Sequence, residues 1–256
     1  AGPALTAGTS TIEWIAISPD GRTLAAGGDD TRVTIWDLSG TPVLDATLPP
    51  AENYVYSLAF TPDGHTLAIG TVGGAVHLWN IADPRHPSRL GRPTAVSAAY
   101  VYCVAFSPDG RTLAVGSGDK HVRLYDVTDP HIPTLIGAPL SGPTNNVGSV
   151  AFAPDGRTLA AGSDDHTVWL YDLTNRAHPA ALATLDSAPG RVIALAWNQD
   201  GTVLAAGAEG QLRLWDFDPE SVARAICASA GDPITGPEWN LYVPGSAYRP
   251  PCRAAW

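Results

Sequence analysis

The stretch ISPDGRTLAAGGDDTRVTIWDL, from Ile17 to Leu38, carries the pattern that predicts the fold. Pro19 presets φ at the first corner of a tight turn, Asp20 tolerates the second corner, and Gly21 supplies the positive φ that completes a hairpin. After a second turn, the run RVTIWDL alternates apolar and polar residues and is rich in β-branched ones. Together with the apolar run before the first turn, this pattern predicts three short strands.

The same line occurs five times along the chain. Each copy has a turn Asp, and consecutive turn aspartates are 43 to 46 residues apart: Asp20, Asp63, Asp109, Asp155 and Asp200. A more variable apolar piece follows each of the first four copies and adds a fourth strand. A unit of this size buries its faces only when neighbouring units stack on it, so the sequence predicts radial or linear repetition.

The period, the Pro-Asp-Gly turn and the Trp-Asp ending resemble WD-repeat β-propellers, and most closely the alanine-rich repeats in the propeller parts of actinobacterial regulatory and signalling proteins. The resemblance covers residues 1 to about 217. It implies an all-β propeller of four-stranded antiparallel blades, in which the outermost strand of each blade comes from the next repeat along. The five repeats are expected at about 3–38, 42–81, 88–127, 134–173 and 180–217.

The sequence departs from this family at a hydrogen-bond network that often joins a Gly-His loop, a Ser/Thr, a turn Asp and the Trp. The five His positions hold Gly8, Ala51, Ser97, Pro143 and Ala188, and the five Ser/Thr positions hold Ala26, Ile69, Val115, Ala161 and Ala206. We therefore expect the network to be missing from all five blades, and packing and turns to hold them. Exchanging Asp165 for Ala is then expected to cost about 1 kcal/mol.

The turns are expected to depend on aspartates that cap the backbone. These structural residues are Asp20, Asp30, Asp63, Asp109, Asp119, Asp155, Asp165 and Asp200.

Closure of the ring has two interpretations. The fifth repeat ends after its third strand. Residues 3–8 precede the first repeat at the spacing expected for an outermost strand. They either pair with the strand expected at 211–216 and seal a ring of five blades, or complete a blade whose repeat belongs to an upstream segment or another chain. An open arc of five blades exposes two apolar blade faces.

Residues 218–256 form a second region, with a helix expected to begin at Asp218 and Pro219 and an extended tail that docks on the propeller. Within this tail, Cys227 and Cys252 can form a disulfide, although two thiols are the favoured interpretation in a cytosolic protein. Cys103 lies in a first strand and is expected in the core.

Charge and motifs exclude several functions. The 256 residues carry a formal charge of −10, which disfavours nucleic acid and anionic membranes, and no apolar stretch is long enough to span a bilayer. The sequence lacks the motifs of common hydrolases, nucleotide-binding proteins and metalloproteases. We therefore expect no catalytic residue, cofactor or metal, and a cytoplasmic location, with secretion as an alternative.

One group of residues is expected to bind a partner at the mouth of the central channel, where first strands begin. Tyrosines from the second and third repeats dominate it, with polar residues beside them. The residues are Glu13, Asn53, Tyr54, Tyr56, Tyr100, Tyr102, Asn146 and Arg191. Tyr suits interfaces because it combines a large apolar area with a hydroxyl. The alternative is that these rings pack between blades as ordinary strand residues.

These features predict a non-enzymatic propeller that binds a protein or peptide, as a scaffold or sensor within a larger bacterial signalling or defence protein. A structural or oligomerisation segment is the first alternative. An enzyme with its site at the channel mouth is the second, and Glu13, Arg191 and a few turn acids are the groups available to it.

Overall fold

The computed structural model describes residues 5–6, 10–185, 190–218 and 220–222, and these contain strands in five antiparallel sheets. The first two sheets consist of β1 (Ile12–Ile17), β2 (Thr23–Gly28), β3 (Val33–Asp37) and β4 (Val43–Thr47), then β5 (Val55–Phe60), β6 (Thr66–Thr71), β7 (Ala75–Asn80) and β8 (Ser88–Ala95). The third and fourth consist of β9 (Val101–Phe106), β10 (Thr112–Ser117), β11 (Val122–Asp126) and β12 (Thr134–Leu140), then β13 (Val147–Phe152), β14 (Thr158–Ser163), β15 (Val168–Asp172) and β16 (Ala180–Leu185). The fifth consists of β17 (Val192–Trp197), β18 (Val203–Ala208) and β19 (Gln211–Asp216).

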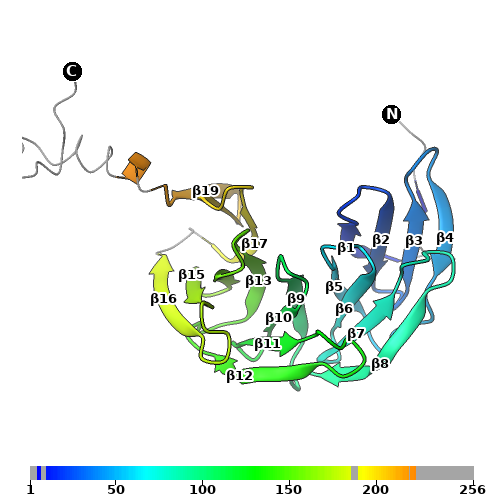
Figure 1. Ribbon diagram of the computed structural model, residues 1–256, viewed down its shortest axis with the longest axis horizontal. Helices are drawn as coiled ribbons and strands as arrows, with labels where there is room; N and C mark the ends of the chain where they lie inside the picture. The colour runs from blue at the N-terminus through cyan, green and yellow to red at the C-terminus, as the bar shows by residue number, and fades with distance from the viewer. Residues whose placement is uncertain (1–4, 7–9, 186–189, 219, 223–256) are drawn as a thin grey trace, which may run out of the picture.

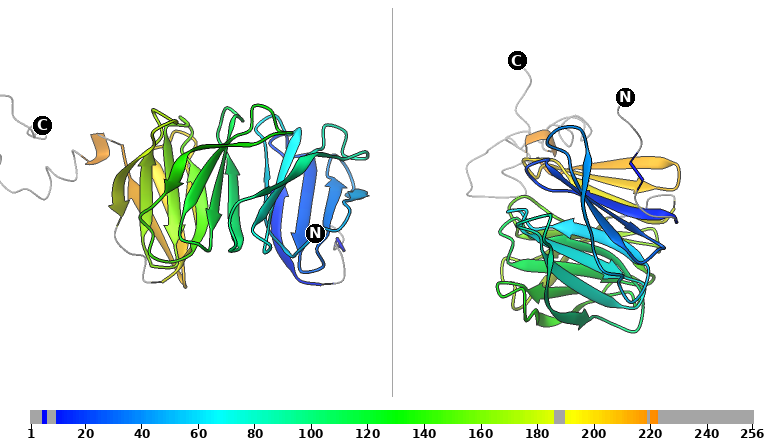
Figure 2. Two further views of the ribbon diagram at one scale, coloured as in Figure 1. Left: turned by 90° about the horizontal axis from the view of Figure 1, so that it is seen from below. Right: turned by 90° about the vertical axis from the view of Figure 1, so that its right-hand side faces the viewer.

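The sheets stand around a common centre as the blades of a propeller (Figure 1). The innermost strands lie side by side, β1 with β5, β5 with β9, β9 with β13, and β13 with β17. Figure 2 shows the same blades from the side. The all-β propeller with four-stranded antiparallel blades is therefore confirmed.

The ring of blades is open between β17 and β1, which stand apart on the two sides of the opening (Figure 1). Leu5 and Thr6, the part of residues 3–8 that the structure describes, belong to no strand. In the described part of the chain, β19 is therefore the edge of a three-stranded sheet. Closure of five blades by residues 3–8, one of the two interpretations, is not seen in Leu5 and Thr6, and the rest of that segment lies outside the described residues.

The first turn of each repeat has the predicted conformation. The glycines of the five Pro-Asp-Gly or Gln-Asp-Gly turns all have φ between 67° and 74°: Gly21, Gly64, Gly110, Gly156 and Gly201. In the first of them, the Gly21 N–H donates to the Ser18 carbonyl over 2.9 Å. The local chemistry of these residues thus sets the hairpins that start every blade.

The core lies between blades rather than within them. Val55 and Leu58 of β5, for example, pack with Ile35 of β3 in one buried cluster, and three similar clusters follow at the next junctions. Cys103 is buried in one of these, as predicted. Each blade is therefore stabilised mainly by its two neighbours.

The predicted helix begins after the last strand. Asp218 accepts a hydrogen bond from the Ser221 N–H at 2.8 Å through Oδ2, and residues 220–222 are helical. Asp218 is therefore the N-cap, as the sequence predicted. The remainder of the tail, including Cys227 and Cys252, lies outside the described residues.

Candidate functional site

The channel-mouth face is built from the starts of the innermost strands and the turns beside them. Tyr56 of β5 and Tyr102 of β9 occupy equivalent positions, each between two buried residues of its strand. Because β5 and β9 lie side by side, these two tyrosines become neighbours at one end of the propeller.

Three of the four predicted tyrosines form one cluster. The ring centroids of Tyr56 and Tyr102 are 5.8 Å apart, with an edge-on geometry, and those of Tyr100 and Tyr102 are 5.9 Å apart. Tyr56 and Tyr100 stack at 6.3 Å. Tyr54 is exposed and stands outside these ring contacts. We call Tyr56, Tyr100 and Tyr102 the tyrosine cluster; distances in this range are typical of favourable aromatic pairs.

Gly118 and Asp164 lie at one edge of the tyrosine cluster, and no sequence pattern indicated either role. A Cβ built on Gly118 would lie 3.2 Å from Tyr102 Cε2 and 3.5 Å from Asn146 Oδ1. Asn146 Nδ2 donates to Asp164 Oδ2 over 3.0 Å. Because Gly118 has no side chain, the Tyr102 ring and the Asn146 amide can both lie close to its backbone.

Carboxylates surround the cluster. Burial raises the pKa of Tyr56, and the negative charges of Glu13 and Asp29 raise it further. Burial likewise raises the pKa of Tyr102, with Asp164 adding to the effect and Arg191 opposing it. The Tyr56 and Tyr102 phenols therefore stay protonated at neutral pH and keep a hydroxyl group in a negative electrostatic environment.

The remaining predicted residues lie at the periphery. Arg191 is exposed and its Nε is 3.1 Å from Glu209 Oε1, so this cation already has an anionic neighbour. Asn53 is also exposed, and its side chain lies against Gly73, where a Cβ would meet Asn53 Nδ2. Neither residue takes part in the ring contacts of the tyrosine cluster.

All eight predicted turn aspartates accept a hydrogen bond from the backbone N–H two residues later. The distances lie between 2.8 and 3.3 Å for Asp20, Asp30, Asp63, Asp109, Asp119, Asp155, Asp165 and Asp200. The geometry is that of an Asx turn, in which the side chain imitates a backbone acceptor.

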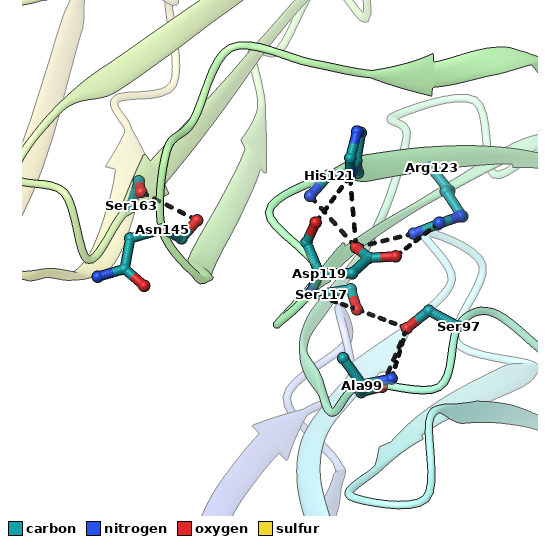
Figure 3. A network of polar contacts seen from close by, with 8 residues as sticks. All are labelled: Ser97, Ala99, Ser117, Asp119, His121, Arg123, Asn145 and Ser163. Atoms are coloured by element: carbon teal, nitrogen blue, oxygen red, sulfur yellow. Dashed lines mark hydrogen bonds and ion pairs between the residues drawn. The ribbon is translucent and has the colours of Figure 1, made fainter.

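The family network was expected to be missing from all five blades, and the third blade has a different polar network in its place. Ser97, at a position where the family often has His, places its Oγ 2.8 Å from Ser117 Oγ. Asp119 in the adjoining turn pairs with Arg123 over 2.6 Å, and His121 Nδ1 lies 2.7 Å from the Asp119 carbonyl oxygen (Figure 3). Hydroxyls and an Arg thus replace the His and Thr of the family pattern.

The fourth blade also has a polar contact where the family network would lie. Asp165 Oδ2 accepts hydrogen bonds from Thr144 N at 2.5 Å and from Thr144 Oγ1 at 3.0 Å. Thr144 directly follows Pro143, the expected His position, so the loop still reaches the turn. Ser163 also donates to the Asn145 carbonyl over 3.4 Å (Figure 3).

In the part of the chain that the structure describes, no group of three or more His, Cys, Asp and Glu side chains is arranged to hold a metal ion. Within the same residues, no helix has the length and apolar character needed to cross a membrane.

A polar groove of about 490 Å³ lies between the first two blades, at the end of the propeller opposite the tyrosine cluster, and is lined by turn residues such as Asp20, Asp63 and Arg85.

Comparison with known proteins agrees with this architecture. A family model described as "WD domain, G-beta repeat" matches residues 4–37, 43–80, 92–126, 135–172 and 180–216. Among curated proteins, none matches the chain. The second match begins at β4, the outermost strand of the first blade, so sequence repeats and structural blades are offset by one strand. The chain therefore belongs to the WD-repeat family of β-propellers.

Proposed function

We propose that the protein is a non-catalytic scaffold that binds a protein or peptide at its channel-mouth face. The tyrosine cluster supports this proposal, because it brings together rings from two blades that are not part of the buried core clusters. Tyr100 is 46% exposed, so a partner can reach it directly. WD-repeat propellers are in general interaction scaffolds, which supports the same role.

The chemistry of the face favours a basic segment. Among the described residues, the charges of Glu13 and Asp29 raise the pKa of Tyr56 and that of Asp164 raises the pKa of Tyr102. Only the Arg191 cation opposes them, at Tyr102. An Arg or Lys side chain gains from the carboxylates and also from the faces of the tyrosine rings. The formal charge of −10 supports a protein partner rather than nucleic acid or an anionic membrane.

A binding role also fits the groups that the face offers. The raised pKa values of Tyr56 and Tyr102 make their phenolates scarce at neutral pH, and Asp164, a carboxylate of the face, accepts a hydrogen bond from the Asn146 amide. We place this scaffold in the cytoplasm, as part of a larger bacterial signalling or defence protein. The alanine-rich repeats described above support that setting.

The test is binding to an array of peptides of equal length that are basic, neutral or acidic. We expect the basic peptides to bind best, and to bind less well as salt concentration rises. A Tyr56→Ala, Tyr102→Ala double variant should lose this binding. Leu135→Ala is the control, because Leu135 is an exposed apolar residue of β12, at the outer edge of the third blade, and it should bind as the natural chain does.

Equal binding of the three peptide classes would contradict the preference for a basic partner. Equal binding by the natural chain and the double variant would contradict the site itself. Circular dichroism and thermal unfolding of each variant show whether the fold is intact before binding is compared.

A second candidate is a structural role, in which the arc joins further β-blades from an upstream segment or another chain. The observation that favours it is the exposure of large apolar side chains on the first and last blades, among them Ile15 and Leu214. Such side chains rarely form a contiguous exposed surface on a protein that acts alone.

A further inference from the structure

The second blade contains a pair of side chains that the other described blades lack. Arg89 Nη2 of β8 lies 2.5 Å from His77 Nδ1 of β7. The residues at the position of His77 in the other blades are Thr34, Arg123, Trp169 and Arg213. Those at the position of Arg89 are Leu44, Leu135 and Ala181. The repeated architecture therefore does not account for this pair.

Strand register places His77 on the face of the second blade that packs against the first blade. His77 is paired with Ile69 of β6. Trp79, two residues farther along β7, is paired with Arg89 of β8. Paired residues, and residues two apart in one strand, lie on the same face of a sheet, so these four side chains share a face. Ile69 and Trp79 belong to the core cluster that also contains Val33 of the first blade, which identifies that face.

A cavity of about 180 Å³ lies at this junction between the first two blades, which stand side by side in Figure 1. Its buried lining consists of His77 and four apolar side chains: Val33, Leu48, Ile69 and Trp79. The exposed residues of the lining, which form its rim, are Pro49, Pro50 and Arg89. An apolar cavity of about 150 Å³ is large enough to hold benzene, so this one has room for a small ring.

His77 has a buried ring nitrogen that no described residue satisfies. His77 is 3% exposed, and no described atom forms a hydrogen bond with its Nε2. A guanidinium only donates hydrogen bonds, so Nδ1 accepts from Arg89 and the proton of the neutral ring is on Nε2. Burial and the Arg89 charge lower the His77 pKa to about 4, which keeps the ring neutral at neutral pH. Trp36, Ser149 and Trp169 also have one such atom each, but His77 is the residue of this set that lines the cavity.

The donors at this cavity suit a carboxylate. The Arg89 guanidinium has further N–H groups besides the one directed at His77, and their planar arrangement matches the two oxygens of a carboxylate. Two charges act on the His77 pKa, and the Arg89 cation has a larger effect than the Glu52 carboxylate. The local charge therefore favours an anion, although the chain as a whole is acidic.

We infer that this cavity binds a small carboxylic acid with an apolar ring. The carboxylate accepts hydrogen bonds from His77 Nε2 and from the Arg89 guanidinium, and the ring lies against the apolar lining. The ligand is a free molecule, because the volume corresponds to a single small ring. This site goes beyond the scaffold function proposed above and is independent of the tyrosine cluster.

Isothermal titration calorimetry of the whole chain with benzoate tests the site. We expect a Kd of about 1 mM or lower, which is ordinary for a ligand of this size. Benzyl alcohol keeps the ring without the carboxylate, and acetate keeps the carboxylate without the ring. Each should bind about tenfold more weakly than benzoate or worse, because each lacks one half of the expected contacts.

Two variants examine the donors. Arg89→Leu changes an exposed residue and should weaken benzoate binding by about tenfold or more. Arg92→Leu is the matched control, because Arg92 is another exposed arginine of β8 that does not line the cavity, and its Kd should equal that of the natural chain. His77→Phe keeps a ring without the N–H and should also weaken binding. In the natural chain, nitrogen NMR of the His77 ring should show the Nε2 signal shift when benzoate is added, which needs no variant to fold.

Four results would overturn the inference. One is no binding of benzoate to the folded natural chain at about 10 mM. The second is equal affinity for benzoate and benzyl alcohol, because the carboxylate would then contribute nothing. The third is an Nε2 signal that benzoate does not shift, or a Kd that neither Arg89→Leu nor His77→Phe changes. The fourth is tighter binding of the dipeptide Gly-Phe than of benzoate, because the carboxylate would then belong to the end of a peptide. Each of these leaves peptide binding at the tyrosine cluster untouched, so the two proposals are tested separately.

Discussion

Replacing Asp165 with Ala tests how strongly a turn aspartate stabilises a blade. Asp165 accepts four hydrogen bonds: from Thr167 N and Oγ1 at 3.1 and 2.5 Å, and from Thr144 N and Oγ1 at 2.5 and 3.0 Å. Asp30, at the equivalent turn of the first blade, accepts one from Arg32 N at 3.1 Å. The two aspartates therefore share the turn but differ in the connection to a distant loop.

The expected cost follows from that difference. The turn hydrogen bond alone contributes about 1 kcal/mol, which is the loss we expect for Asp30→Ala. The bonds from Thr144 go to a charged acceptor and join residues 21 apart in sequence. Because Thr144 is exposed, we expect them to add about 1–2 kcal/mol to the free energy of unfolding, the low end for hydrogen bonds to charged groups. Asp165→Ala should thus reduce the free energy of unfolding by about 2–3 kcal/mol.

Urea denaturation of the two variants at pH 7 measures both losses. The hydroxyl part is isolated by Thr144→Val, which keeps the backbone N–H and should cost less than Asp165→Ala. Equal losses for Asp30→Ala and Asp165→Ala would refute the reasoning, because the contact with Thr144 would then contribute nothing. The effect should also disappear in acid. Burial alone would raise the pKa of Asp165, but hydrogen bonds from Thr167 and Thr144 outweigh it and hold the pKa below its ordinary value, so the stabilisation is lost as pH falls through that folded pKa.

Three other predictions concern single residues. Burial, with the Arg89 guanidinium beside the ring, lowers the pKa of His77 from 6.5 to about 4, so the unfolded chain takes up the proton first as pH falls below 6.5. Unfolding free energy should therefore drop by about 2 kcal/mol through this residue between pH 7 and pH 5, and urea titrations of His77→Gln should lack that drop. Burial raises the pKa of the Cys103 thiol to about 12, so iodoacetamide should leave it unmodified in the folded chain and alkylate it in denaturant, as mass spectrometry of the peptide would show. Leu214→Asp should weaken concentration-dependent association in sedimentation velocity, and natural chains that stay monomeric at high concentration would argue against an exposed apolar face at this position.

The sequence predicted those features that depend on local chemistry or on the repeat itself. Pro-Asp-Gly turns fix their own backbone, so the hairpins were predictable, and the regular spacing placed Tyr56 beside Tyr102. Tyr54 and Tyr100 precede their strands, where alternation no longer indicates direction. The structure was therefore needed to show that Tyr100 joins the cluster and Tyr54 does not.

Contacts between segments far apart in sequence were the features that escaped prediction. Thr144 reaches Asp165 from a loop whose path no local pattern fixes, so the sequence did not predict the contact that lies in place of the family network. Gly207 of β18 belongs to a run of small residues that indicates only a strand. The equivalent glycine of each earlier blade lies against a valine of the next blade, and this contact becomes visible only when the blades are placed side by side.

The open arc has a consequence for the dynamics of the protein. Because the main contacts of each described blade are with the next one along, cooperative stability passes from neighbour to neighbour, and the two end blades have one such neighbour each. Amide hydrogens of the third blade should then exchange most slowly, and those of β17–β19 fastest, as the fifth blade frays without unfolding the rest. Any segment that covers the outer face of β17–β19 would remove this free end and slow exchange there toward the rate of the internal blades.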